Sequence, residues 1–180
     1  MSRLSEIDGS AIMLKKILTG GESGAEQAAW RAGKAFGVAV GGWMPEGFPT
    51  ADGPRPEFAE RYGSTELPSD SRIASTEQNI HDSDATLWFG ETTTEDAQTA
   101  VMVCHRLGKP CMLIYPAASF SPSHVAAWVR SARIETLTVA GNREAVEPGI
   151  GDRVERFLGQ VLQQLGYDQP RSHGDASGPA

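Results

Sequence analysis

A short apolar stretch, a glycine-rich turn and an alanine-rich helical pattern follow one another in residues 16–36, and they constrain the fold more than any other feature. Gly20, Gly21 and Gly24 lie in the turn, where they let the backbone bend sharply and let a ligand approach closely. The alanines after the turn recur at helical spacing, which gives a helix face small enough to pack closely on a sheet. A strand, a glycine turn and a helix in this order are typical of open α/β folds, which place ligands at such turns.

Three sharper interpretations of the turn fit less well. No Lys-Ser or Lys-Thr follows Gly24, so a P-loop is excluded, and the glycine spacing is not that of the dinucleotide fingerprint. Residues 21–25 approach a nucleophile elbow around Ser23, but Ala25 stands where the last glycine belongs. A serine hydrolase would also need a histidine partner, and the sequence ranks none of the four histidines. The turn is therefore a ligand-binding loop, which we favour, or a tight structural corner.

Composition narrows the class of protein. A chain of 180 residues with 39% apolar content is long enough for one domain with an ordinary core. Its net charge of −7 argues against a nucleic-acid or membrane partner, and the start of the chain lacks a secretory apolar region. Two cysteines do not make a disulfide framework, and no paired Cys-x-x-Cys spacing for a zinc site is present. We expect a cytoplasmic protein that binds a small molecule and forms a homo-oligomer.

Alternating strand and helix patterns predict one α/β domain over residues 14–166. We expect a mobile leader at 1–13 and a disordered tail at 167–180. Residues 43–68 are rich in proline and lack periodicity, so we interpret them as a long loop. The domain is expected to hold a five-stranded, mostly parallel sheet covered by helices on both faces. Its strands are predicted near residues 14–18, 37–42, 86–89, 111–115 and 136–140.

Five segments together point to one family. They are Gly-Gly-Glu-Ser-Gly-Ala-Glu at 20–26, Gly-Gly-Trp-Met-Pro-Glu-Gly at 41–47 with Ala-Asp-Gly at 51–53, residues 76–84, Leu-Gly-Lys-Pro at 107–110, and residues 139–144 with Pro-Gly-Ile at 148–150. This chain thereby resembles the putative molybdenum-carrier proteins, a circularly permuted YpsA-like branch of the SLOG superfamily of LOG-like Rossmann folds. The resemblance implies a Rossmann-like three-layer sandwich with a nucleotide-like or phosphate-bearing ligand over the glycine turn. It also implies Mg²⁺ or a molybdenum cofactor as candidate cofactors.

We expect the ligand site at the carboxyl ends of the strands. Its predicted ligand-binding residues are Gly20, Gly21, Glu22, Ser23, Gly24, Gly42, Trp43, Thr76, Asn79, Thr92, Thr93, Thr94, Gly141, Asn142 and Arg143. Trp43 either stacks on a base or packs in the core, and Thr76 with Asn79 forms either a wall of the site or a solvated helix face. One of the three threonines is expected to cap the following helix.

Three departures from the family pattern change the expected charge of the site. Glu22 replaces an amide, Ser75 replaces an arginine, and the turn before Glu95 lacks the family's Gly-Gly-Thr. A phosphate beside two carboxylates is disfavoured unless Mg²⁺ or Arg143 intervenes. The ligand is therefore less anionic than the family's, or linked through a metal, or the site has decayed. Glu22 has no evident packing role, so its replacement by Gln is expected to leave stability unchanged.

Three hypotheses of function follow. The first is a protein that binds a nucleotide-like or phosphate-bearing molecule without chemistry. The second is an enzyme like the nucleoside-monophosphate phosphoribohydrolases of a related branch, in which Glu26 is the candidate acid–base residue. Near the start of a helix, the Glu26 carboxylate would equally serve to complement the helix dipole. The third is a carrier of the molybdenum cofactor.

Overall fold

The computed structural model describes residues 14–116 and 120–169. The predicted leader at 1–13 and residues 170–180 of the predicted tail lie outside the described residues. Where the predicted tail begins, however, Tyr167 packs against the main core and donates a hydrogen bond from its hydroxyl to the Leu14 carbonyl. Residue 167 therefore belongs with the packed domain.

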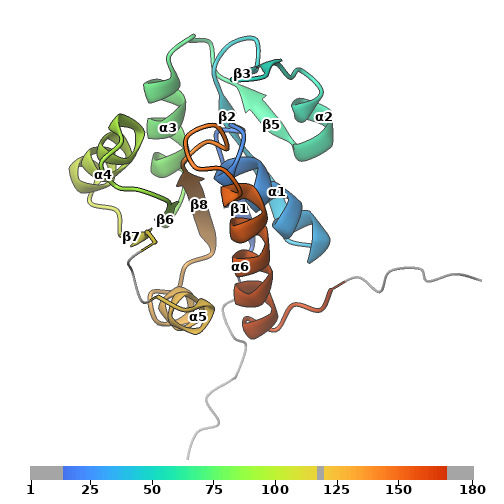
Figure 1. The fold of residues 1–180 in the computed structure, drawn as a ribbon, viewed down its shortest axis with the longest axis vertical. Helices are drawn as coiled ribbons and strands as arrows, with labels where there is room; N and C mark the ends of the chain where they lie inside the picture. Colours follow the sequence, from blue (N-terminus) through green and yellow to red (C-terminus); the bar gives the residue numbers. More distant parts are fainter. Residues whose placement is uncertain (1–13, 117–119, 170–180) are drawn as a thin grey trace, which may run out of the picture.

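Six parallel strands form the main sheet, in the order β5-β2-β1-β8-β6-β7 (Figure 1). They are β1 (Lys16–Leu18), β2 (Ala39–Met44), β5 (Ser64–Glu66), β6 (Ala85–Phe89), β7 (Cys111–Ile114) and β8 (Thr136–Gly141). The predicted parallel α/β sheet is confirmed, but its predicted count of five strands is one too low. The additional strand, β5, pairs with the end of β2 and forms one edge of the sheet.

The stretch predicted as a loop at 43–68 contains four short elements. Before β5 come the antiparallel pair β3 (Pro49–Thr50) and β4 (Gly53–Pro54) and the helix α2 (Phe58–Tyr62). Phe58 and Tyr62 lie one helical turn apart and bury their rings against Trp30, which stacks on Tyr62 at a centroid distance of 4.5 Å. Contacts with a distant helix therefore stabilise this segment, whose elements are too short to show a periodic pattern.

Helices cover both faces of the sheet, as Figure 1 shows. The helices α1 (Ala25–Ala35), α5 (Pro122–Ser131) and α6 (Ile150–Gln164) bury the larger core against one face. On the other face, α3 (Arg72–His81) and α4 (Glu95–Leu107) pack over Trp88 and Ala140. This arrangement confirms the Rossmann-like three-layer sandwich.

The topology singles out the carboxyl ends of β1 and β8. From β1 the chain moves to β2 and β5 at one side of the sheet, then crosses through α3 to β6 at the other side. Strand β8 finally inserts between β6 and β1. Open α/β sheets leave a crevice where the connections diverge in this way, so the fold itself places a candidate site beside the glycine turn.

Candidate functional site

A pocket of about 170 Å³ lies at this carboxyl edge, between the glycine turn, the starts of α3 and α4, and the end of β8. Six of the predicted site residues line it: Gly20, Glu22, Glu26, Thr76, Gly141 and Arg143. The other lining residues are Arg72, Ile73, Ser75, Trp88, Glu95, Asp96, Thr99 and Ala140. Segments far apart in the sequence therefore meet here, and most of the lining side chains are polar or charged.

The chain itself satisfies much of the hydrogen bonding in the glycine turn. The N–H of Gly21 donates to Thr19 Oγ1 at 3.1 Å, and the N–H of Glu22 donates to Glu26 Oε2 at 2.8 Å. The N–H of Ala25, the first residue of α1, donates to the Asn142 carbonyl at 3.3 Å. The loop after β8 thus fixes the start of α1, and the turn enters the pocket already ordered.

Glu22 is buried and paired, contrary to the expectation that it has no packing role. Only 3% of the residue is exposed. Its Oε1 accepts from the N–H groups of Ser23 and Ala51, at 3.0 and 2.9 Å, which joins the turn to the β3–β4 hairpin. Its Oε2 lies 2.6 Å from an Arg72 guanidinium nitrogen, as an ion pair without hydrogen-bond geometry. The acidic departure at Glu22 is therefore balanced by a cation on α3.

Sequence reasoning missed Arg72, although a signal for it exists. The family's arginine position is occupied by Ser75, and Arg72 lies three residues earlier, about one turn back on the same helix. It is also four residues before Thr76, so both side chains lie on one helical face and line the pocket. A search for a cation at helical spacing from Ser75 would have found it.

Glu26 lies over the glycine turn rather than in solvent. Its Oε2 would lie 3.0 Å from a Cβ added to Gly20, so the carboxylate rests against the turn itself. Burial raises the pKa of Glu26 from 4.5 to about 7, although the hydrogen bond from Glu22 and the charge of Arg72 lower it. A carboxyl group that titrates near neutrality can accept or donate a proton at the pocket.

The opposite wall carries a second ion pair. Arg143 lies 3.2 Å from Asp96 Oδ2, and its side chain is 38% exposed. The pocket thus holds four acidic and two basic side chains. Among the described residues, each arginine pairs with one carboxylate, while Glu26 and Glu95 have no ion-pair partner. An anionic ligand would therefore have to compete with the carboxylates already bound to the two guanidinium groups.

Trp88 contributes an unsatisfied donor. It lines the pocket from β6, is 2% exposed, and its indole N–H has no acceptor in the part of the chain that the structure describes. Buried N–H groups are nearly always paired in folded proteins. No separate signal in the sequence points to this residue, since a tryptophan in an apolar strand is usually a core side chain.

Several predicted site residues serve the fold instead. Asn79 makes two hydrogen bonds to the backbone of Trp43, while the Trp43 indole donates to Asp82, and neither residue lines the pocket. Thr94 caps α4, as expected for one threonine of the three, and also donates to Asn142. Also outside the pocket lining are Gly21, Ser23, Gly24, Gly42, Thr92, Thr93 and Asn142.

The glycines outside the pocket have packing reasons. A Cβ on Gly21 would lie 2.7 Å from the side chains of both Met44 and Trp30, so this position faces the core rather than a ligand. A Cβ on Gly42 would lie 2.0 Å from the Thr19 carbonyl oxygen. Ligand contact by any of the predicted residues stays a prediction.

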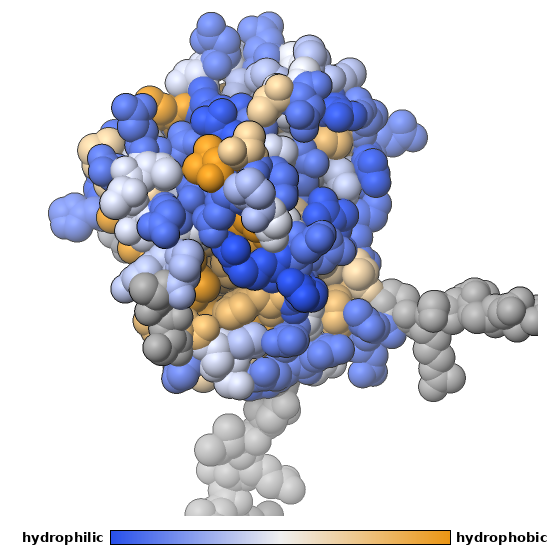
Figure 2. All heavy atoms as spheres, in the orientation of Figure 1, coloured by the Kyte–Doolittle hydropathy of each residue, from blue (hydrophilic) through white to orange (hydrophobic). Residues whose placement is uncertain are grey.

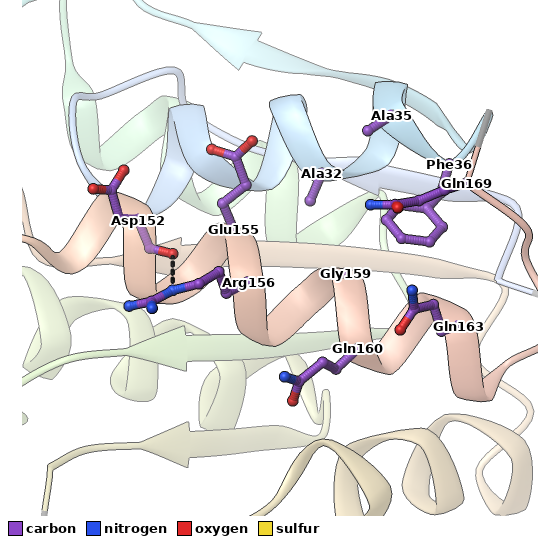
Figure 3. A pocket seen from close by; sticks show the side chains of 10 residues that line it. All are labelled: Ala32, Ala35, Phe36, Asp152, Glu155, Arg156, Gly159, Gln160, Gln163 and Gln169. Atoms are coloured by element: carbon purple, nitrogen blue, oxygen red, sulfur yellow. Dashed lines mark hydrogen bonds between the residues drawn. The ribbon is translucent and has the colours of Figure 1, made fainter. Parts of the chain in front are cut away.

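A larger groove of about 660 Å³ lies elsewhere, between α1 and α6 (Figure 3). Ala32, Ala35 and Gly159 line it together with glutamines, and Arg156 turns back to the Asp152 carbonyl at 3.3 Å. The groove runs along the two helices, whereas the smaller pocket lies at the carboxyl ends of the strands beside the glycine turn. We therefore place the candidate site in the smaller pocket.

The described residues add two further facts. No helix among them is long and apolar enough to cross a membrane. No three histidine, cysteine or acidic side chains of residues 14–116 and 120–169 are grouped to hold a metal ion.

The face of the molecule in Figure 2 is mainly hydrophilic, with apolar side chains in a band across its lower half.

Comparisons with known proteins agree with the resemblance seen in the sequence. A model of the circularly permutated YpsA SLOG family matches residues 17–162. The chain is also similar to a solved structure from Syntrophus aciditrophicus SB, described as a "Putative molybdenum carrier protein". The TM-score is 0.73 and the identity 28%, over 83% of this chain and 95% of that chain. A comparison with curated proteins found no match.

Proposed function

Since this chain belongs to the circularly permutated YpsA SLOG family, we propose that it binds a nucleotide-like or phosphate-bearing small molecule in the pocket beside the glycine turn. The observation that carries the proposal is the meeting of Arg72 and Arg143 with that turn at the carboxyl edge of the sheet. Guanidinium groups recognise phosphate and other oxyanions through paired hydrogen bonds. Both side chains are more than a third exposed, so a ligand can reach them.

The size of the pocket limits which part of the ligand is enclosed. Pockets that hold a whole drug-sized ligand measure about 300–1,000 Å³, whereas this one measures about 170 Å³. We therefore propose that the oxyanion and its neighbouring atoms enter the pocket and that the rest of a nucleotide-like ligand lies outside it. Binding would exchange the carboxylate partners of the two arginines for ligand oxygens.

Two other functions are each favoured by one observation. The similarity to the Syntrophus protein favours a molybdenum carrier, and molybdate is a tetrahedral oxyanion that the same guanidinium groups would bind. The pKa of Glu26, raised by burial to about 7, favours an enzyme that hydrolyses a nucleoside monophosphate with this residue as general acid or base.

Calorimetric titration with AMP, ADP-ribose and molybdate tests the proposal, and chromatography of the AMP mixture tests for release of adenine. We expect AMP or ADP-ribose to bind, and Arg143→Gln to weaken that binding by about tenfold, the value of one exposed charged hydrogen bond. Arg55→Gln is the matched control, because Arg55 is similarly exposed but lies outside the pocket lining. Equal affinity in Arg143→Gln and wild type would contradict the assigned site, and molybdate binding alone would favour the carrier.

A further inference from the structure

A backbone N–H of the glycine turn already binds a carboxylate of the protein itself. At a helix start, an anion is normally held by backbone N–H groups and by the positive end of the helix dipole. Here the N–H of Glu22 donates to Glu26 Oε2 at 2.8 Å, and Gly24, the N-cap of α1, contributes no side-chain cap. The Glu26 carboxylate thus accepts an N–H of the turn that a ligand anion would otherwise accept.

The Glu26 carboxylate lies directly against the glycine turn. The Glu26 carboxylate rests on Gly20, where an added Cβ would lie 3.0 Å from Oε2. Gly20 and Glu26 both line the pocket. An oxyanion that reaches the turn must therefore displace the Glu26 carboxylate or meet it in its neutral form.

The charges around Glu26 do not offset a second negative group. Glu22 and Arg72 face it from the turn and from α3, and they pair with each other at 2.6 Å. From the start of α4 and the loop after β8, Asp96 and Arg143 pair at 3.2 Å, and Glu95 adds another negative charge to the lining.

An independent observation in the same pocket is an unpaired hydrogen-bond donor. The indole N–H of Trp88, which is 2% exposed, has no acceptor within the described residues although Trp88 lines the same pocket. An oxyanion oxygen is a strong acceptor and would satisfy this donor.

We propose that Glu26 determines the specificity of the pocket, so that the pocket takes an oxyanion only together with a proton. This inference rests on the proposed function. Below neutrality the neutral carboxyl group can leave the turn, or donate a hydrogen bond to the anion, without electrostatic repulsion. Above neutrality the Glu26 carboxylate must first take up a proton. The affinity for the anion should therefore fall by nearly tenfold for each further unit of pH. No covalent step is involved, and one proton moves from solvent to Glu26 for each anion bound.

Sulfate and molybdate are suitable probes because they do not titrate near neutrality, unlike phosphate and AMP. For a carboxyl group with a pKa of about 7, the affinity of wild-type protein should fall about tenfold between about pH 6 and about pH 8. In Glu26→Gln, which keeps the size and the acceptor oxygen, the change should be within about twofold. Calorimetry in two buffers of different ionisation enthalpy should show uptake of about one proton per anion by wild type at about pH 8, and none by the variant.

Glu95→Gln is the matched control, because it removes one negative charge from the same pocket without touching the turn. It should keep the wild-type pH dependence. If Glu26→Gln fails to fold, Glu26→Asp replaces it, since the shorter side chain withdraws the carboxylate from the Glu22 N–H. Proton uptake by the wild type alone provides a second readout.

The outcomes separate the inference from the function on which it rests. Binding of an oxyanion without pH dependence, or with the same pH dependence in wild type and Glu26→Gln, would overturn the role of Glu26 and leave the proposed function standing. If sulfate, molybdate, AMP and ADP-ribose all fail to bind at every pH, both proposals are overturned.

Discussion

Replacing Glu22 with Gln should destabilise the protein, and the structure gives the magnitude. The Glu22 carboxylate accepts two backbone hydrogen bonds through Oε1 and holds Arg72 through Oε2. Gln keeps one oxygen for the two N–H groups, but it loses the charge and presents either donors or a weaker acceptor to the guanidinium. The perturbation therefore removes an interaction without changing volume.

Hydrogen bonds to charged groups contribute about 1.5–3 kcal/mol, and those between neutral groups about 1 kcal/mol. The loss of charge at the two N–H groups should therefore cost about 1 kcal/mol. The unpaired guanidinium should add about 1 kcal/mol more, well below the cost of breaking a fully buried pair, because the Arg72 side chain is 37% exposed and can turn to water. A total of about 2 kcal/mol lowers the melting temperature of a domain of this size by about 4–8 °C.

Urea and thermal unfolding of wild type and Glu22→Gln measure this loss. Glu57→Gln is the control, since Glu57 forms an exposed pair with Arg55 at 3.4 Å and its replacement should change stability by less than about 0.5 kcal/mol. A double-mutant cycle with Arg72→Gln should recover about 1 kcal/mol of coupling. A melting temperature unchanged to within about 1 °C would refute the reasoning, because Glu22 would then have no packing role, as the sequence alone suggests.

Three further predictions concern the turn and its neighbours. Gly42→Ala should abolish soluble folded protein, because its Cβ would lie 2.0 Å from a backbone oxygen. Gly37→Ala is the control: its Cβ would meet open space, so only the φ of +71° should matter, and urea unfolding should show a loss of about 1 kcal/mol. Gly21→Val should lower the melting temperature whatever it does to ligand affinity, since its Cβ would lie 2.7 Å from two core side chains; an unchanged melting temperature would contradict this packing. Glu26 has a folded-state pKa of about 7, above its ordinary 4.5, so its contribution to stability is complete below about pH 4.5 and is lost as pH rises through about 7. Solvent screening reduces this loss to about 2 kcal/mol of unfolding free energy. Urea unfolding measured in steps of pH should show a flatter pH profile for Glu26→Gln than for wild type.

Local patterns were enough to predict most of the fold. The glycine turn, the alanine face of α1 and the threonine cap of α4 all depend on residues close in sequence, and each is present. The segment at 43–68 could not be predicted in the same way. Its helix and its strand β5 depend on Trp30 and on the end of β2, and neither contact leaves a periodic pattern in the segment itself.

For the candidate site, the sequence located the loops more reliably than the side chains. Thr76 and Asn79 share a polar helix face, but Thr76 lines the pocket while Asn79 uses its amide to bind the backbone of Trp43. Polarity in a sequence indicates that a side chain needs a partner, and it does not say whether that partner is a ligand or the chain. Arg72 shows the reverse case, because its role depends on Glu22, fifty residues away in the sequence.

Stability alone explains the Glu22–Arg72 ion pair of the pocket, but it does not explain why Glu26 carries an ionisable group. A buried Glu22 needs a cation, so Arg72 has a structural reason to be present whether or not a ligand binds. Glu26 accepts the Glu22 N–H, but its surroundings disfavour the ionised form, so an uncharged side chain of the same size would cost less near neutral pH. Ionisable side chains whose pKa is shifted by their surroundings are concentrated at functional sites, where they lower stability but serve catalysis or ligand recognition. Glu26 is therefore the side chain of the pocket whose replacement we expect to change ligand binding most.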